Sequence, residues 1–321
     1  MKTTLLAFVI ASSSLVLTSA QGQPARPASP VRPAPNPAST EVQVLPVQKS
    51  VYLLASAAGN IAVQIGDDGV LLVDAGAAPM AQQLFAAIRT ISKKPIHTII
   101  NTHLHGDHTG GNAALFKLGS GGPQAPRVMG HENVYNRMIE AAVAANANTP
   151  TSAFPMNAYF TPTRDFFLNG EAIVLHHVPA AHTDGDTLVH FRGSDVLSTG
   201  DVFTPDLYPV IDLENGGSVN GEIAALNRIL ELTVPAKFQE GGTYVIPGHG
   251  RICDEAEVVE YRDMVTIIRD RVADLVKKGL TLQQVKAARP TRDYDAEYGT
   301  DTGFWTTEMF VEAVYRTINA K

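Results

Sequence analysis

Apolar residues recur at two different periods along this chain, and each period predicts a different element. Residues 51–76 hold two apolar runs, divided by Gly-Asn and Asp-Asp-Gly turns, which predicts strands joined by hairpins. From Pro79 to residue 92 the apolar positions follow helical spacing, and proline favours the first turn of a helix. A short apolar run at residues 97–101 then predicts a strand.

The same two periods continue to the end of the chain. Helical spacing predicts further helices at residues 132–145, 220–232, 255–278 and 304–318. Short apolar runs predict further strands at residues 172–178, 187–192, 195–199 and 243–246. Because strands lie before, between and after the helices and no second linker divides them, an α/β domain is predicted.

The first 40 residues are predicted to lie outside that domain. Residues 1–20 combine a lysine, an apolar run and a small-residue ending, the pattern of a secretory signal peptide cleaved before Gln21. Serines interrupt the apolar run, which falls short of the roughly 20 residues of a membrane span, so a retained anchor is the alternative. Residues 21–40 are proline-rich and predict a disordered linker. One domain over residues 41–321, in a periplasmic or secreted protein, is therefore expected.

Composition narrows the possible partners. The 321 residues are 45% hydrophobic and 18% charged, which suits a globular core. The net charge of −7 and the lack of a Lys/Arg-rich run exclude the basic surface that nucleic-acid binding needs. Cys253 is the only cysteine and cannot form an internal disulfide. We expect no nucleic-acid partner and no stable membrane span after signal cleavage, and the oligomeric state is left open.

Three histidines and an aspartate lie together in the run His-Leu-His-Gly-Asp-His, at His103, His105, Asp107 and His108. Borderline-soft divalent cations take nitrogen and oxygen ligands of this kind. Alternate side chains of an extended segment project to one side, so His103 and His105 are expected to point together. The following glycine lets the backbone turn, so Asp107 and His108 can be directed at a second cation close by.

Further candidate ligands follow later predicted strands, where loops collect functional groups. They are His182 in PAAHTDGDT, Asp201 in LSTGDVF and His249 in VIPGHG. Five histidines and two aspartates make seven ligands, which two zinc ions could share if one carboxylate bridges them. A smaller set would indicate a single metal.

The ordered ligand set resembles the metallo-β-lactamase superfamily, in which His-x-His-x-Asp-His is followed by single His, Asp and His ligands. The resemblance covers residues 41–260, including LLVDAG at residues 71–76. It implies a four-layer αββα sandwich, with two mixed sheets face to face, helices outside and the metals at one edge. It also implies ligand roles: His103, His105 and His182 for the first metal, Asp107, His108 and His249 for the second, and Asp201 bridging both.

The bridging position separates branches of this superfamily. Dedicated zinc β-lactamases usually have Cys or Ser where this chain has Asp201, whereas a bridging Asp is similar to glyoxalase II thioesterases and related esterases and lactonases. The resemblance thus implies hydrolysis of a small ester, thioester or lactone. The alternatives are a β-lactamase, a mononuclear iron dioxygenase acting on a sulfur substrate, a non-catalytic metal-binding module and a barrel-fold amidohydrolase. Iron or manganese could replace zinc.

The expected chemistry follows from the metals. Zinc lowers the pKa of its bound water to about 7, so hydroxide bridging two zinc ions would attack the carbonyl of a small acyl substrate. Asp107 could orient that water as well as bind metal, which makes it the candidate catalytic residue for proton transfer. No dedicated general acid is apparent beside the motif. Loops at residues 119–126 and 148–162 are expected to set specificity.

Other polar and aromatic residues have a structural interpretation beside the functional one. Asp74 is expected to hydrogen-bond backbone amides in its VDAG turn rather than to bind metal. Thr183 and Asp186 could orient His182 through its free ring nitrogen, or lie exposed to solvent. Phe203 and Tyr208 could line a substrate pocket or belong to the core. The other histidines are expected to be structural: His97, His131, His176, His177 and His190.

Overall fold

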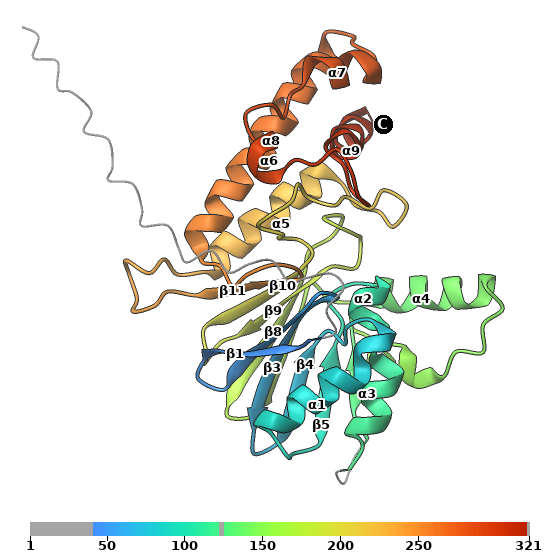
Figure 1. Ribbon diagram of the computed structural model, residues 1–321, viewed down its shortest axis with the longest axis vertical. Helices are drawn as coiled ribbons and strands as arrows, with labels where there is room; N and C mark the ends of the chain where they lie inside the picture. Colours follow the sequence, from blue (N-terminus) through green and yellow to red (C-terminus); the bar gives the residue numbers. More distant parts are fainter. Residues whose placement is uncertain (1–40, 122–124, 320–321) are drawn as a thin grey trace, which may run out of the picture. The chain divides into compact units, whose positions relative to one another are not determined.

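The computed structural model describes residues 41–121 and 125–319, all within one compact unit of the chain. Its centre is a pair of sheets, one with strand order β1-β2-β3-β4-β5-β6 and one with order β11-β10-β9-β8-β7 (Figure 1). The predicted signal peptide (1–20) and linker (21–40) lie outside the described residues. None of the described helices is long and apolar enough to cross a membrane.

The first sheet combines an antiparallel meander with a parallel extension. Its strands are β1 (Gln43–Gln48), β2 (Val51–Ser56), β3 (Gly59–Gly66), β4 (Gly69–Val73), β5 (Ile96–Ile100) and β6 (Arg127–Met129). Gly66 pairs with Gly69 across a two-residue turn, and Gly69 has a φ of 134°, which favours glycine. Because β4, β5 and β6 run parallel, each connection needs a crossover.

The second sheet is antiparallel except for its last strand. It consists of β7 (Thr163–Leu168), β8 (Glu171–His177), β9 (Thr187–Phe191), β10 (Val196–Gly200) and β11 (Tyr244–Pro247). Strand β11 pairs parallel to β10 after the chain has crossed through a helix. Consequently β8, β10 and β11 point the same way, and the segments that follow them leave the same edge.

Helices cover the outer face of each sheet. The α-helices are α1 (Ala81–Ile91), α2 (Gly106–Thr109), α3 (Asn112–Gly119), α4 (Glu132–Ala144), α5 (Val219–Leu232), α6 (Glu255–Lys277), α7 (Leu282–Ala288), α8 (Asp295–Tyr298) and α9 (Thr307–Asn319), and short 3₁₀ turns are η1 (Ala78–Met80) and η2 (Thr151–Ala153). Helices α1 and α3 lie on the first sheet, and α5 and α6 on the second (Figure 1). The αββα prediction is confirmed.

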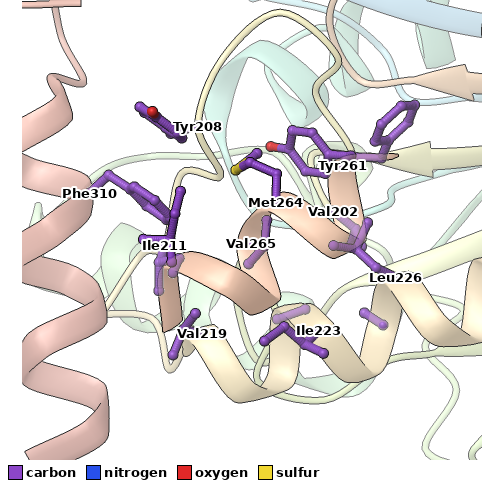
Figure 2. Close-up of a cluster of buried hydrophobic side chains, with 14 of the residues drawn as sticks. Val202, Tyr208, Ile211, Val219, Ile223, Leu226, Tyr261, Met264, Val265 and Phe310 are labelled. Atoms are coloured by element: carbon purple, nitrogen blue, oxygen red, sulfur yellow. The ribbon is translucent and has the colours of Figure 1, made fainter. Parts of the chain in front are cut away.

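Three apolar clusters hold these layers together. Between the sheets, Leu71 and Ile100 of the first pack with Val189 and Phe191 of the second. The outermost cluster joins α5, α6 and α9 and is drawn in Figure 2. The ring of Tyr208 stacks on a ring of α9 there, with centroids 4.8 Å apart. These contacts bury apolar surface on both faces of each sheet, which is the dominant stabilising term in folding.

Most expected elements form close to their expected bounds, and the exceptions have local causes. The helix expected at residues 304–318 begins only at Thr307, because Thr306 Oγ1 accepts from the backbone N–H of Met309 at 3.3 Å and caps it. The sequence pattern does not predict β7, an edge strand whose residues are mostly exposed and therefore lack alternation. It also does not predict β1, β6, α2, α3, α7 or α8, which are mostly short.

Candidate metal centre

The structure brings the seven predicted ligands together at one edge of the two sheets. His103 and His105 follow β5, and Asp107 and His108 lie in the short helix α2. The others come directly after strands of the second sheet: His182 after β8, Asp201 after β10 and His249 after β11. They form three groups that could each hold a metal ion, namely His103 with His105 and His182, His103 with His108 and Asp201, and Asp107 with His108 and His249.

Distances within the first group match a shared cation. His105 Nδ1 lies 3.1 Å from His103 Nε2 and 3.0 Å from His182 Nε2. Ligand atoms at about 2.0–2.1 Å from a tetrahedral zinc ion lie about 3.3 Å from one another. Both separations are close to the one that a shared zinc ion requires.

Hydrogen bonds elsewhere on the rings decide which nitrogens carry protons. His182 Nδ1 lies 2.5 Å from the carbonyl oxygen of Val210, which can only accept, so Nδ1 carries the proton. His105 Nε2 lies 2.8 Å from Asp212 Oδ2 and donates in the same way. In a neutral imidazole the other nitrogen is then a bare lone pair. Two lone pairs thus face each other at 3.0 Å, an arrangement that a cation between them would stabilise.

His103 completes this pattern through Thr102. The Thr102 hydroxyl donates to Asp74 Oδ2 at 2.8 Å, so its oxygen accepts from His103 Nδ1 at 3.0 Å. His103 Nε2 is therefore also a lone pair directed at the group. These three residues fit a bound cation. Their three nitrogen lone pairs converge, and none of the three nitrogens carries a proton that could form a hydrogen bond between them.

The second group is built around His108. His108 Nδ1 lies 2.8 Å from Asp74 Oδ2, and its Nε2 lies 3.3 Å from Asp201 Oδ1. Both of these last atoms are buried and have no hydrogen-bond partner among the described residues. His249 Nε2 lies 3.1 Å from Asp107 Oδ2. Buried polar atoms normally have hydrogen-bond partners, so the unpartnered His108 Nε2 and Asp201 Oδ1 also fit a bound metal.

Asp201 lies between the two groups. Its Oδ1 faces His108, while its Oδ2 is 3.9 Å from the Nε2 atoms of both His103 and His182 and 3.7 Å from that of His249. These last three separations are too long for hydrogen bonds. The carboxylate thus lies within 4 Å of ligand nitrogens of both groups, as a bridging ligand would.

Electrostatics favour metal binding more on one side than on the other. Burial lowers the pKa of His103 and of His182, so both are neutral as ligands must be. Burial would raise the pKa of the Asp201 carboxyl, but neighbouring His108 holds it well below its ordinary value. Burial would lower the pKa of His108, but the carboxylates of Asp201 and Asp74 raise it well above its ordinary value. A metal on that side must displace a proton.

Of the three residues expected to support the ligands, Asp74 bonds a ligand histidine, whereas Thr183 and Asp186 bond each other. Asp74 is buried with a φ of 70°; its Oδ1 accepts from the backbone N–H of Thr102 at 2.8 Å while Oδ2 holds His108. Among the described residues, neither Thr183 nor Asp186 hydrogen-bonds the ring of His182, and neither is exposed. Both are buried, and Thr183 donates to Asp186 through its hydroxyl at 2.5 Å and its backbone N–H at 2.8 Å. They brace the loop, because Val210 already occupies the ring nitrogen.

Asp212 is the supporting residue that sequence reasoning missed. Besides holding His105, it accepts from Asn215 Nδ2 at 2.6 Å and from the backbone N–H groups of Glu214 and Asn215 at 3.1 Å. Burial would raise the pKa of Asp212, but the bonds from His105 and Asn215 lower it below its ordinary value. Asp212 follows an apolar stretch without a motif, so only the folded loop reveals its role.

A cavity of about 1250 Å³ opens onto the candidate metal centre. Its apolar wall comes from the loop after β10 and from the approach to α9: Leu207, Val210, Ile211, Leu213, Phe304, Trp305, Met309 and Ala313. The indole nitrogen of Trp305 is buried without a partner among the described residues. The prediction that loops at residues 119–126 and 148–162 set specificity is wrong. Neither residues 148–162 nor the described part of 119–126 lines the cavity. Phe203 and Tyr208 lie in the core instead.

Known proteins agree with this architecture. A family model described as the metallo-beta-lactamase superfamily matches residues 54–250, more than half of the chain. The alpha subunit of 2,4-dinitroanisole O-demethylase from Nocardioides sp. (strain JS1661) is 27% identical over 169 residues, which are 52% of this chain and 48% of that subunit. The chain therefore spans about half the length of this curated relative.

Two solved proteins share the fold. Structures of the sec-alkyl sulfatase Pisa1 from Pseudomonas sp., one a double mutant, cover 86% of this chain and 50% of theirs. Their TM-scores are 0.67 and 0.63 at 17% and 18% identity. A metallo-beta-lactamase from Pontibacter korlensis covers 70% of this chain and 99% of its own, with a TM-score of 0.55 at 17% identity. At such low sequence identities, these similarities show a shared fold and nothing more.

The family match, the sandwich and the ordered His/Asp groups agree with one another. The family match and the His/Asp groups support the prediction of a metal-dependent hydrolase. The chain belongs to the metallo-β-lactamase superfamily.

Proposed function

We propose that this protein is an exported hydrolase that uses two zinc ions to cleave a small, apolar, uncharged ester, thioester or lactone. The observation that carries the proposal is the position of Asp201, whose carboxylate lies within 4 Å of ligand nitrogens of both groups. A carboxylate in this position can bind both cations. Export is supported by the sequence of residues 1–20.

Each metal would have its own protein ligands. His103, His105 and His182 would hold the first, Asp107, His108 and His249 the second, and Asp201 both. Zinc bound there would lower the pKa of a coordinated water and polarise the substrate carbonyl.

Asp107 is the carboxylate best placed to orient the attacking water. Its side chain is 39% exposed, it lines the cavity and it contacts His249. Burial would raise the pKa of Asp107, but the hydrogen bond from His249 lowers it below its ordinary value, so the carboxylate is charged at neutral pH. The charged carboxylate can therefore accept a hydrogen bond from the attacking water and orient it beside the metals.

The cavity wall supports the choice of substrate. Its lining combines the apolar wall with acidic groups at Asp206, Glu214 and Glu312 and one basic group at Arg316. Glu312 is paired with Lys286, and the remaining carboxylates still outnumber the guanidinium, which disfavours anionic substrates, whereas the apolar wall favours a hydrophobic acyl or alcohol group. An uncharged ester with an apolar body fits this lining better than a sulfate ester does.

An activated aryl methyl ether is the second candidate substrate. The relative that is 27% identical carries the name of a 2,4-dinitroanisole O-demethylase subunit. Phe304 and Trp305 line the cavity, and aromatic side chains pack well against an aryl ring.

A substrate panel on metal-analysed full-length protein tests the proposal. The panel contains aryl esters of rising chain length, a thioester, lactones, a chromogenic cephalosporin and 2,4-dinitroanisole, each with zinc, manganese or iron. We expect two zinc ions per chain and fastest turnover of an apolar ester, thioester or lactone. Protein without stoichiometric metal, or with one iron and oxygen uptake, would contradict the proposal.

Single variants separate catalysis from mere metal binding. Asp107→Ala is expected to abolish most of the activity, because it removes a ligand and the carboxylate that orients the water. Asp206→Asn is the matched control, since Asp206 lines the same cavity but belongs to no metal-binding group. An Asp107→Ala variant that retains every detected activity would mean that the activity does not arise at this site, and would favour a non-catalytic metal-binding module.

A further inference from the structure

A second cleft, of about 670 Å³, lies on the outer face of the second sheet. Its lining comes from the β1–β2 turn, strands β8 and β9, the turn after β9, and the end of α5: Gln48, Lys49, Val174, His176, His190, Arg192, Gly193, Asp195, Arg228, Glu231, Leu232, Val234 and Gln239. We call it the outer cleft.

The outer cleft is separate from the candidate metal centre. Strand β9 begins beside that centre, where the backbone N–H of Thr187 donates to the Thr102 carbonyl at 2.9 Å. The strand then runs away from it to Phe191, and Arg192 follows. The two sites share no lining residue. A ligand in the outer cleft would therefore be held independently of the metals.

Positive charge in the outer cleft is only partly neutralised. Arg228 bonds Glu231 Oε2 at 2.8 Å, and Lys49 donates to the Gly193 carbonyl. The Asp195 carboxylate accepts from Thr243 Oγ1 at 2.8 Å and from Gln239. The guanidinium of Arg192, in contrast, has no hydrogen-bond or ion-pair partner among the described residues. Within a chain of net charge −7, this leaves a local excess of positive charge.

Two buried imidazoles form the floor of the cleft. His176 and His190 are 7% and 8% exposed and lie on neighbouring strands. Arg228 Nη2 lies 3.3 Å from His176 Nδ1, so that nitrogen accepts and Nε2 carries the proton. His176 Nε2 and His190 Nδ1 have no partner among the described residues. Burial and nearby arginines lower the pKa of His176 to about 4 and also lower that of His190, so both rings are neutral.

These observations argue against a cation in the outer cleft. Neither imidazole belongs to a group of three candidate metal ligands among the described residues. The charges of Arg192 and Arg228 would also repel a metal ion. The guanidinium groups of Arg192 and Arg228, which line the cleft, instead favour an anionic ligand.

We propose that the outer cleft binds a small oxyanion, a phosphate, sulfate or carboxylate group, held by Arg192 and Arg228 over the imidazoles of His176 and His190. Guanidinium groups bind such anions through two parallel hydrogen bonds, which are stronger than neutral ones. Nearby Lys49 adds charge at the rim. The ligand is either a free inorganic ion or the anionic end of a small organic molecule.

Anion binding to three variants of the zinc-loaded full-length protein tests this. The probes are inorganic phosphate and glycerol 3-phosphate, measured by calorimetry. Arg192→Gln removes a charge without breaking any described bond, and Arg228→Gln removes the second guanidinium. Arg164→Gln is the control, because Arg164 is an exposed arginine of β7 outside the cleft. Because phosphate can also bind at metals, the comparison between variants carries the result.

The expected result is a dissociation constant weakened about tenfold or more in Arg192→Gln and Arg228→Gln and unchanged in Arg164→Gln. Tighter binding of glycerol 3-phosphate than of phosphate identifies an organic ligand, and equal binding identifies the inorganic ion. Equal affinities of Arg192→Gln and the unaltered protein would overturn the proposal. The hydrolytic rate of Arg192→Gln is expected to be normal, so this result is independent of the proposed function.

Discussion

The buried histidines of the candidate metal centre, His103, His108 and His182, and those of the outer cleft, His176 and His190, have different partners. At the metal centre His105 and His108 have carboxylate partners, Asp212 and Asp74, which fix the proton on the far nitrogen. In the outer cleft His176 and His190 have arginines nearby and buried nitrogens without partners.

This difference teaches how the same residue type is prepared for ligands of opposite charge. A carboxylate behind an imidazole makes the facing nitrogen a better lone-pair donor and fixes the ring. A guanidinium beside an imidazole keeps the ring neutral and leaves an N–H to donate. Burial alone therefore does not identify a metal ligand; the partner of the other ring nitrogen does.

The largest effect is expected from Asp201→Asn. An amide cannot bridge two cations as a carboxylate does, so turnover should fall by more than about 100-fold, above the usual loss from an outer partner. Steady-state kinetics with the best ester measures the loss. Asp206→Asn, in the same cavity, should change the rate only a few-fold. Near-normal turnover of Asp201→Asn would remove the distinction between the bridging carboxylate and its neighbours.

Removing a carboxylate partner should weaken one metal selectively. Asp74→Asn should lower affinity mainly for the metal on the His108 side, because Asp74 contacts His108 directly and reaches His103 only through Thr102, and Asp212→Asn should lower it for the metal on the His105 side, each by about 10–100-fold. Competition with a chromogenic chelator measures both affinities. Asp165→Asn, at an exposed position of β7, serves as control. If both variants weaken the same metal, the assignment of partners to sides is incorrect.

Asp74 and Asp212 show how much of the site can be predicted from the sequence alone. Asp74 lies in the VDAG turn before the ligand run and could be singled out as a hydrogen-bonding residue. Asp212 reaches His105 across 107 residues, and nothing in its spacing indicates that contact. Local motifs predict which side chains leave a strand end, because parallel strands bring their ends to one edge. They do not predict how a long loop folds back.

The same limit applies to the fold. Strands with buried faces, such as β3, β4 and β9, have apolar runs that predict them. The edge strand β7 and the cavity wall at Phe304 and Trp305 depend on tertiary neighbours rather than on periodicity. The apolar pattern therefore predicted an α/β domain and the family resemblance implied the sandwich and its ligand set, while the substrate wall required the structure.

Acidification should remove the two metals in order. The pKa of His108 is raised by Asp201 and Asp74 despite burial, and that of His249 is raised mainly by Asp107 despite burial. Metal on that side displaces protons near neutral pH, so its affinity should fall about tenfold per pH unit and per proton as pH decreases. His103 and His182 have lowered pKa values and lose metal only at lower pH. Metal content after dialysis at stepped pH checks this; simultaneous release contradicts it.

The smallest expected effect concerns the cavity wall. Trp305→Ala removes apolar surface from the lining, so KM for an apolar ester should rise by about tenfold while kcat changes little. Phe167→Ala removes an exposed aromatic residue outside the cavity and is the control. A change in kcat alone would mean that the wall acts on the reaction rather than on substrate binding.

Anomalous diffraction at the zinc edge tests the central claim most directly. In crystals of zinc-loaded protein the account predicts two zinc peaks, one among His103, His105 and His182 and one among Asp107, His108 and His249, with Asp201 between them. A single peak, or zinc bound away from these side chains, would contradict it.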